Sequence, residues 1–147
     1  MNMINLSNEL RGHVIVGHGV DIVDISDFNR LFTEKMLPFL NRNFTETEIA
    51  NAGVGVNRVA KLAGRFAVKE AVLKALGIGW GDGIAFTDVE VITLETGAPT
   101  VRLYRRLAEL ETKHQIVDWL VSTSHTSFVA FASVIALRSV DGALQRV

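Results

Sequence analysis

The chain has 147 residues, of which 48% are hydrophobic and 21% charged, a composition typical of one globular domain and not of a disordered segment. Its net charge is −1, with 15 Lys and Arg against 16 Asp and Glu, so no overall field attracts nucleic acid or a membrane surface. Cysteine is absent, which excludes disulfides, thiolate metal sites and a cysteine nucleophile.

The N-terminal residues and the first predicted strand define where the domain begins. Residues 1–13 lack the apolar run of a secretory signal. We therefore expect an N-terminal extension at 1–13, a single domain at 14–147 and a cytoplasmic protein. The stretch HVIVGHGVDIVDI is rich in β-branched residues and predicts a first strand.

Capping residues predict two helix starts after this strand. Ser26 is a candidate N-cap for a helix beginning at DFNRLF, because its hydroxyl can accept a bond from a free amide of the first turn. Thr45 lies three residues before Glu48, which is the spacing of a capping box, and predicts a second start.

A long amphipathic helix is predicted over residues 58–76 and ends at Gly77. Its apolar stripe contains Val59, Leu62, Ala63, Phe66 and Leu73. Glu70 falls inside this stripe. Either it reaches the edge of the stripe or pairs with Lys74 at i,i+4, or it is a carboxylate among apolar neighbours that needs a cation.

A second side of the same helix carries cations. Arg58, Lys61, Arg65 and Lys69 follow one another at intervals of 3, 4 and 4 residues, so they form one ridge. Such a ridge is usually a solvated face. It could also bind phosphates or an acidic protein, and charge alone does not choose between these interpretations.

Asp21 is a second carboxylate that interrupts an apolar face. Period-two alternation places it on the side of Ile15 and Val23 in the first strand. For Asp21 alone the default explanation is a bond to a neighbouring amide. Together with Glu70 it suggests a Mg²⁺ site, because Mg²⁺ takes one or two carboxylates and completes its shell with water and substrate phosphates.

The C-terminal half predicts strands and one helix. Strands FTDVEVITL and TVRLYR flank a turn at ETGAP, and RRLAELETKH predicts a helix. Trp119–Leu137 has no Asp, Glu, Lys or Arg over 19 residues, but its six Ser and Thr and one His favour two strands over a membrane helix. The glycines of GIGWGDG follow a helix, so they do not form a dinucleotide-binding fingerprint. These elements predict an α+β fold with a largely antiparallel sheet packed against the long helix.

His125 lies at the predicted bend between the last two strands, in STSHTS. An isolated histidine in a turn is more often structural or solvated than catalytic. Ser124 is adjacent, so the two side chains would point in opposite directions in a strand, and no G-x-S-x-G motif is present. We therefore exclude a serine hydrolase.

The segments GVDIVDI, FTETE, RFAVKEAVLKALG, FTDVEV, GAP and STSHT occur in this order between Val14 and Ala136. In this order they resemble the holo-acyl-carrier-protein synthases, small bacterial 4′-phosphopantetheinyl transferases of the fatty acid synthase type. The most specific part is RFAVKEAVLKA together with the upstream G-x-D-I-V. The resemblance implies the 4′-phosphopantetheinyl transferase fold. It also implies Mg²⁺-dependent transfer of phosphopantetheine from coenzyme A to a serine of acyl carrier protein, with release of adenosine 3′,5′-bisphosphate.

The resemblance also assigns residues. Asp21 and Glu70 match the metal ligands of the family, and Lys74 matches a lysine near the phosphates of coenzyme A. His125 matches the histidine of the C-terminal motif. The remaining assigned positions bind coenzyme A: Arg65, Gly97 and Pro99. The serine proton could pass to Glu70, to a metal-bound water or to His125.

Two further expectations follow from the resemblance. The first is a homotrimer with active sites between subunits, in which Asp21, Glu70 and Lys74 come from one subunit and Arg65 and His125 from its neighbour. The second is that the chain departs from the family where its carrier protein binds. Family members often have basic residues in the helix after Asp21, whereas this chain has DISDFNR, and Ala98 replaces a frequent lysine.

Two alternatives from other classes stay open at this point. A Mg²⁺-dependent phosphohydrolase of coenzyme A or nucleotides could use the same carboxylates with water as the nucleophile. A non-catalytic module that binds carrier protein would need no metal, and the presence of both Asp21 and Glu70 argues against it.

Overall fold

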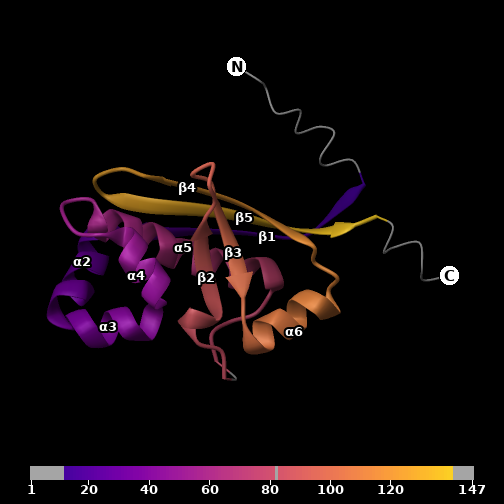
Figure 1. Cartoon of the computed structure of the whole chain (residues 1–147), viewed down its shortest axis with the longest axis horizontal. Helices are drawn as coiled ribbons and strands as arrows, with labels where there is room; N and C mark the ends of the chain where they lie inside the picture. The colour runs from indigo at the N-terminus through magenta and orange to yellow at the C-terminus, as the bar shows by residue number, and fades with distance from the viewer. Residues whose placement is uncertain (1–11, 82, 141–147) are drawn as a thin grey trace, which may run out of the picture.

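The computed structural model describes residues 12–81 and 83–140 and has an α+β architecture (Figure 1). In chain order the elements are β1 (His13–Asp24), α2 (Ile25–Glu34), α3 (Met36–Asn43), α4 (Glu46–Ala52), α5 (Arg58–Leu76), a 3₁₀ turn η1 (Phe86–Asp88), β2 (Val89–Thr93), β3 (Pro99–Leu103), α6 (Arg105–Lys113), β4 (Asp118–His125) and β5 (Val129–Ser139). The predicted fold class is confirmed. The predicted N-terminal extension falls mostly on residues outside the described part and stays a prediction.

The strands form two antiparallel sheets. The larger has the order β1-β5-β4, and the smaller pairs β2 with β3. Trp119–Leu137 forms most of the β4–β5 hairpin, as predicted, with Trp119 opposite Ala136. Within the described residues no helix is long and apolar enough to cross a membrane.

Helix α5 lies between the three-stranded sheet and the β2–β3 pair (Figure 1). It has the predicted bounds, and Gly77 ends it in a left-handed conformation with a φ of 69°. Two glycines let it approach β1: a Cβ at Gly17 would overlap the carbonyl oxygen of Ala75, and one at Gly19 would overlap that of Ala71. The two glycines of GHG therefore permit direct backbone contact between β1 and α5.

The core has two parts, which meet at α5. The helical part surrounds Phe28 and Phe44 and includes Leu62 and Ala63, which belong to the predicted apolar stripe. The second part lies between α5, α6 and both sheets, around Val72 and Leu107. Helix α5 is thus buried on more than one side, and little of its surface remains for solvent.

Several local predictions need correction. Ser26 is not an N-cap, because α2 starts at Ile25, two residues before the predicted start, and the Asp24 side chain accepts the bond from the Asp27 amide at 2.9 Å. Ile15 does not share a face with Asp21, because the register shifts between Ile15 and Gly17. The capping box of Thr45 and Glu48 at the start of α4 is confirmed.

Two predicted strands are shorter than expected. FTDVEVITL begins with the 3₁₀ turn, and strand β2 starts only at Val89. TVRLYR stops at Leu103, because Tyr104 precedes α6 and Arg105 begins it. Phe128 lies just before β5 and is 78% exposed.

Candidate active site

Lys74 and Asp21 form an ion pair between α5 and β1. Lys74 Nζ donates to Asp21 Oδ1 at 2.9 Å and to the backbone oxygen of Val20 at 3.0 Å. The Lys74 side chain is 53% exposed and that of Asp21 is 15% exposed. The surface alternative, a pair between Lys74 and Glu70, is wrong: the structure pairs Lys74 with Asp21.

Glu70 is half-buried beside this pair. Burial raises the pKa of Glu70, and the charge of Asp21 raises it further, whereas Trp80 and Lys74 lower it. The indole Nε1 of Trp80 is buried and makes no hydrogen bond of normal geometry to any described residue. Asp21 and Glu70 line the same cavity, so the structure brings the two carboxylates together as the sequence suggested.

The two carboxylates and Lys74 line one cavity of about 460 Å³. Phe66, one turn before Glu70, forms part of its apolar wall, and Asp24 and Asp27 from the start of α2 line it as well. Asp24 caps α2, and Asp27 lies 3.8 Å from Arg30.

The donor set fits one hard divalent cation. No group of three or more His, Cys, Asp and Glu side chains is gathered for a metal within residues 12–81 and 83–140. Asp21 and Glu70 could hold Mg²⁺, which commonly takes only one or two protein carboxylates and leaves the remaining positions to water and substrate oxygens.

The other predicted site residues line a second cavity, of about 180 Å³. It contains Arg65 from α5, Gly97 and Pro99 from the β2–β3 turn, and His125 from the end of β4. Gly97 has a φ of 86°, a conformation that favours glycine in this tight turn. Arg65 Nε is buried and has no hydrogen-bond partner among the described residues. His125 is exposed, and its Nδ1 lies 3.3 Å from the oxygen of Thr126.

The structure therefore divides the predicted site into two groups. Asp21, Glu70 and Lys74 line the larger cavity, and Arg65 and His125 the smaller one, with no residue shared among the described lining residues. Arg65 and Glu70 are five positions apart on α5, which places them on different sides of the helix. One chain does not gather all the predicted residues in one cavity.

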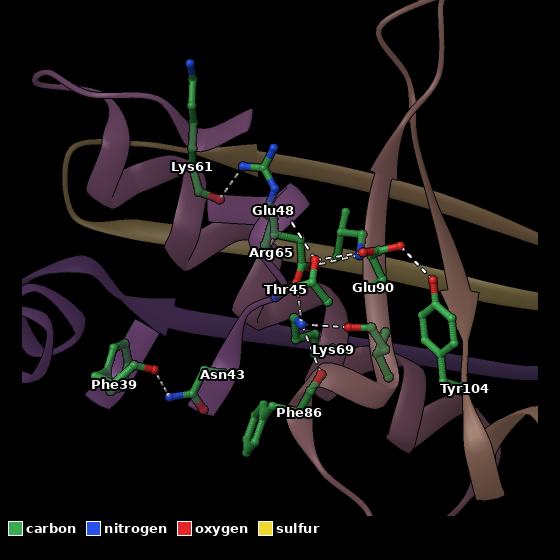
Figure 2. A network of polar contacts seen from close by, with 12 residues as sticks. Phe39, Asn43, Thr45, Glu48, Lys61, Arg65, Lys69, Phe86, Glu90 and Tyr104 are labelled. Carbon is green, nitrogen blue, oxygen red and sulfur yellow. Dashed lines mark hydrogen bonds and ion pairs between the residues drawn. The ribbon is translucent and has the colours of Figure 1, made fainter. Parts of the chain in front are cut away.

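The predicted cationic ridge is wrong at Lys69. Its side chain and that of Glu48 are both 0% exposed and form an ion pair of 2.8 Å, with Lys69 Nζ and Glu48 Oε2 as the two atoms (Figure 2). Desolvation lowers the pKa of Lys69, and Glu48 opposes this effect. The sequence held one signal for this: Val68 and Val72 make a second apolar side of the helix next to Lys69.

A family model and several known proteins match most of the chain. The family model of the 4′-phosphopantetheinyl transferase superfamily matches residues 17–131. A holo-acyl-carrier-protein synthase of Solibacter usitatus is 36% identical over 122 residues, which are 83% of this chain and 98% of the relative. A protein of the same name from Gloeobacter violaceus is 41% identical over 120 residues, 79% of this chain and 88% of the relative.

Solved structures show the same fold. The holo-acyl-carrier-protein synthase of Neisseria meningitidis has a TM-score of 0.75 at 28% identity and covers 84% of this chain and 98% of its own. That of Helicobacter pylori, solved in complex with coenzyme A, has a TM-score of 0.72 at 29% identity and covers 81% and 98%. The chain belongs to the 4′-phosphopantetheinyl transferase superfamily, among its holo-acyl-carrier-protein synthases.

Proposed function

We propose that the chain transfers 4′-phosphopantetheine from coenzyme A to a serine of apo-acyl carrier protein, using Mg²⁺ held by Asp21 and Glu70. Family membership supplies the reaction. The structural observation that supports its placement is the single cavity lined by Asp21, Glu70 and Lys74. Two acidic groups beside one cation suit a diphosphate that arrives with a divalent metal.

The protein residues position charge around the transferred group. Phosphoryl transfer depends mainly on positioning and charge neutralisation. Bound Mg²⁺ would supply the charge that stabilises the diphosphate. Lys74, which is half exposed, can leave Asp21 and donate to a phosphate oxygen. A serine hydroxyl that enters this cavity would meet Glu70 as the proton acceptor of the same chain, because His125 opens into the other cavity.

Two features of the single chain support a homotrimer with shared sites. The first is the division of the predicted site between two cavities. The second is the apolar outer face of the large sheet, opposite the face that packs on α5. This face includes Ile22, 66% exposed, its cross-strand partner Phe131, 37% exposed, and Leu120, 37% exposed. A sheet face of this kind is typical of an interface, and a closed three-fold ring would cover it.

In such a trimer the two cavities of neighbouring subunits would face each other. Asp21, Glu70 and Lys74 of one subunit would bind the diphosphate and the metal. Arg65 and His125 of the neighbour would then approach the nucleotide part of coenzyme A, and the buried Nε of Arg65, which has no partner among the described residues of one chain, would gain an anion.

The carrier protein would dock on α2 and α3. An apolar groove along these helices shares Leu31, Phe39 and Phe66 with the wall of the carboxylate cavity. Lys35 and Arg42 line the same groove and are exposed, so they form a positive rim. Basic residues are scarce on α2 in this chain, and α3 would take over the contact with an acidic partner.

Mass spectrometry of apo-acyl carrier protein incubated with the chain, coenzyme A and Mg²⁺ tests the proposal. The expected result is a gain of one phosphopantetheine mass on the carrier, and the gain disappears with EDTA. Release of free phosphopantetheine with an unmodified carrier would instead identify a phosphohydrolase.

A further inference from the structure

The buried pair of Lys69 and Glu48 joins α5 to α4 and β2 (Figure 2). Lys69 Nζ donates to Glu48 Oε2 at 2.8 Å, to the backbone oxygen of Phe86 at 3.0 Å and to that of Val89 at 2.6 Å. An ammonium group has three protons, so all of its donors are used.

Glu48 is equally well bonded. Its Oε2 also accepts from the Thr45 amide at 2.8 Å, and its Oε1 accepts from the Val91 amide at 3.0 Å. The neighbouring Glu90 belongs to the same region but accepts from hydroxyl groups, those of Thr45 at 2.7 Å and of Tyr104 at 2.9 Å. A fully bonded network of this kind fixes the orientation of the Lys69 and Glu48 side chains as well as the distance between them.

Stability alone does not explain this pair. Replacing a buried ion pair by apolar side chains of similar volume is often neutral or stabilising, because both charges lose their hydration. Helix α5 contacts β1 through Gly17 and Gly19, which pack on the backbone of Ala71 and Ala75, and through Lys74, which bonds Asp21 and the Val20 carbonyl near the end of the helix. The Lys74 side chain is 53% exposed, whereas the bonds of Lys69 are fully desolvated, so Lys69 adds a stronger directional constraint on the rotation of α5.

The rotation of α5 decides where Glu70 points. Lys69 and Glu70 are neighbours and differ by about 100° around the helix axis. Bonds that hold Lys69 against β2 therefore hold Glu70 toward β1, where Asp21 lies.

A second connection runs through Phe86. Lys69 binds the backbone oxygen of Phe86, whose ring stacks on Phe66 at 4.9 Å and on Trp80 at 3.7 Å between ring centroids. Phe66, on which this ring stacks, lines the cavity of Glu70. The ion pair is therefore connected to the surroundings of Glu70 in two ways, through helix α5 and through the Phe86 ring.

We propose that Glu48 and Lys69 are positioning residues, which orient Glu70 toward Asp21 by fixing the rotation of α5 and the place of the Phe86 ring. This inference rests on the proposed function, because it concerns the carboxylate pair that would hold Mg²⁺. It assigns the pair a role in the geometry of the site and not in the stability of the fold.

The test is the double variant Glu48→Leu/Lys69→Met, which replaces both charged side chains by apolar side chains of similar volume. Its unfolding midpoint, its affinity for Mn²⁺ alone measured by electron paramagnetic resonance, and its kcat and KM for coenzyme A are compared with the wild type. We expect a folded protein of near wild-type stability. Mn²⁺ binding and kcat should each be weaker by about tenfold or more, the usual range for residues that orient metal ligands.

Glu90→Gln is the matched control, because Glu90 lies in the same polar region and its hydrogen bonds go to Thr45 and Tyr104, outside α5. It should keep the Mn²⁺ affinity of the wild type. Should the double variant fail to fold, Glu48→Gln replaces it. That variant keeps the side-chain volume and leaves Lys69 its two carbonyl acceptors, and it should bind Mn²⁺ more weakly than Glu90→Gln does.

Wild-type Mn²⁺ affinity and turnover in a folded double variant would overturn the positioning role and leave the proposed function intact. Equal Mn²⁺ affinities of Glu48→Gln and Glu90→Gln would overturn it as well. A wild-type protein that neither binds Mn²⁺ nor modifies carrier protein would overturn the proposed function, and the positioning role with it.

Discussion

Lys74 Nζ lies 2.9 Å from Asp21 Oδ1, and this contact holds the exposed end of α5 against β1 beside Glu70. In the sequence, Glu70 lies 49 residues and Lys74 lies 53 residues after Asp21. The close approach of the two backbones at Gly17 and Gly19 makes the contact possible.

Removal of either carboxylate should stop transfer without unfolding the chain. We expect Asp21→Ala and Glu70→Ala to lower kcat by more than about 100-fold, the scale of losing a main electrostatic stabiliser. Because burial disfavours the charged form of Glu70, its removal should leave the apo protein at least as stable. Thermal unfolding and the carrier assay measure the two effects, and full activity of either variant at ordinary Mg²⁺ would refute the metal assignment.

Lys74→Ala should weaken the use of coenzyme A. A lost hydrogen bond to a charged phosphate costs about 1.5–3 kcal/mol, which lowers kcat/KM for coenzyme A by about 10- to 100-fold. The ion pair with Asp21 is partly exposed, so the free energy of unfolding should change by less than about 1 kcal/mol. Kinetics at varied coenzyme A concentration measure this effect. An unchanged kcat/KM would show that Lys74 does not contact the phosphates and only pairs with Asp21.

Gly19→Ala should destabilise the fold. Its Cβ would overlap the carbonyl oxygen of Ala71, and such overpacking costs about 1–3 kcal/mol or more. Gly64→Ala on α5 is the opposite control, because its Cβ meets no described atom within 4 Å. Alanine in a helix interior is favoured over glycine by about 0.5–1 kcal/mol. Urea unfolding should therefore give shifts of opposite sign, and a harmless Gly19→Ala would disprove the close contact.

Charge reversal at Lys35, just before α3, and at Arg42 on α3 should weaken the binding of carrier protein and not that of coenzyme A. We expect Lys35→Glu and Arg42→Glu to raise KM for an acidic carrier, because both cations line the groove that leads to the carboxylate cavity. The effect should shrink as salt is added. Lys113→Glu, an exposed cation on α6, serves as the control. If all three variants show the same KM for the carrier, the carrier docks elsewhere.

Much of the fold could be predicted because its signals are local. The capping box at Thr45, the αL glycine at Gly77 and the uncharged Trp119–Leu137 hairpin each depend on neighbours in the sequence. The long helix was predicted with its observed bounds for the same reason. The errors at Ser26 and Ile15 come from a competing cap, Asp24, and from a strand irregularity that alternation cannot foresee.

The site could be predicted only in part, because its contacts join residues that lie far apart in the sequence. Asp21 and Glu70 stood out because each interrupts an apolar pattern, and the structure brings them to one cavity. Lys69 was misplaced because its charge fitted a solvated ridge, and nothing local shows that Glu48, 21 residues earlier, lies beside it. The pairing of Lys74 with Asp21 likewise depends on how α5 packs on β1.

The most direct test of the account is subunit complementation. Glu70→Ala and Arg65→Ala, each expected to be inactive and folded, are mixed, unfolded and refolded together, and the carrier assay is run on the mixture. Sites shared between subunits predict that some activity returns, because a site with Asp21 and Glu70 from one intact half and Arg65 from another re-forms, and sedimentation should give three times the monomer mass. No activity at any mixing ratio, or a fully active monomer, would contradict the shared site.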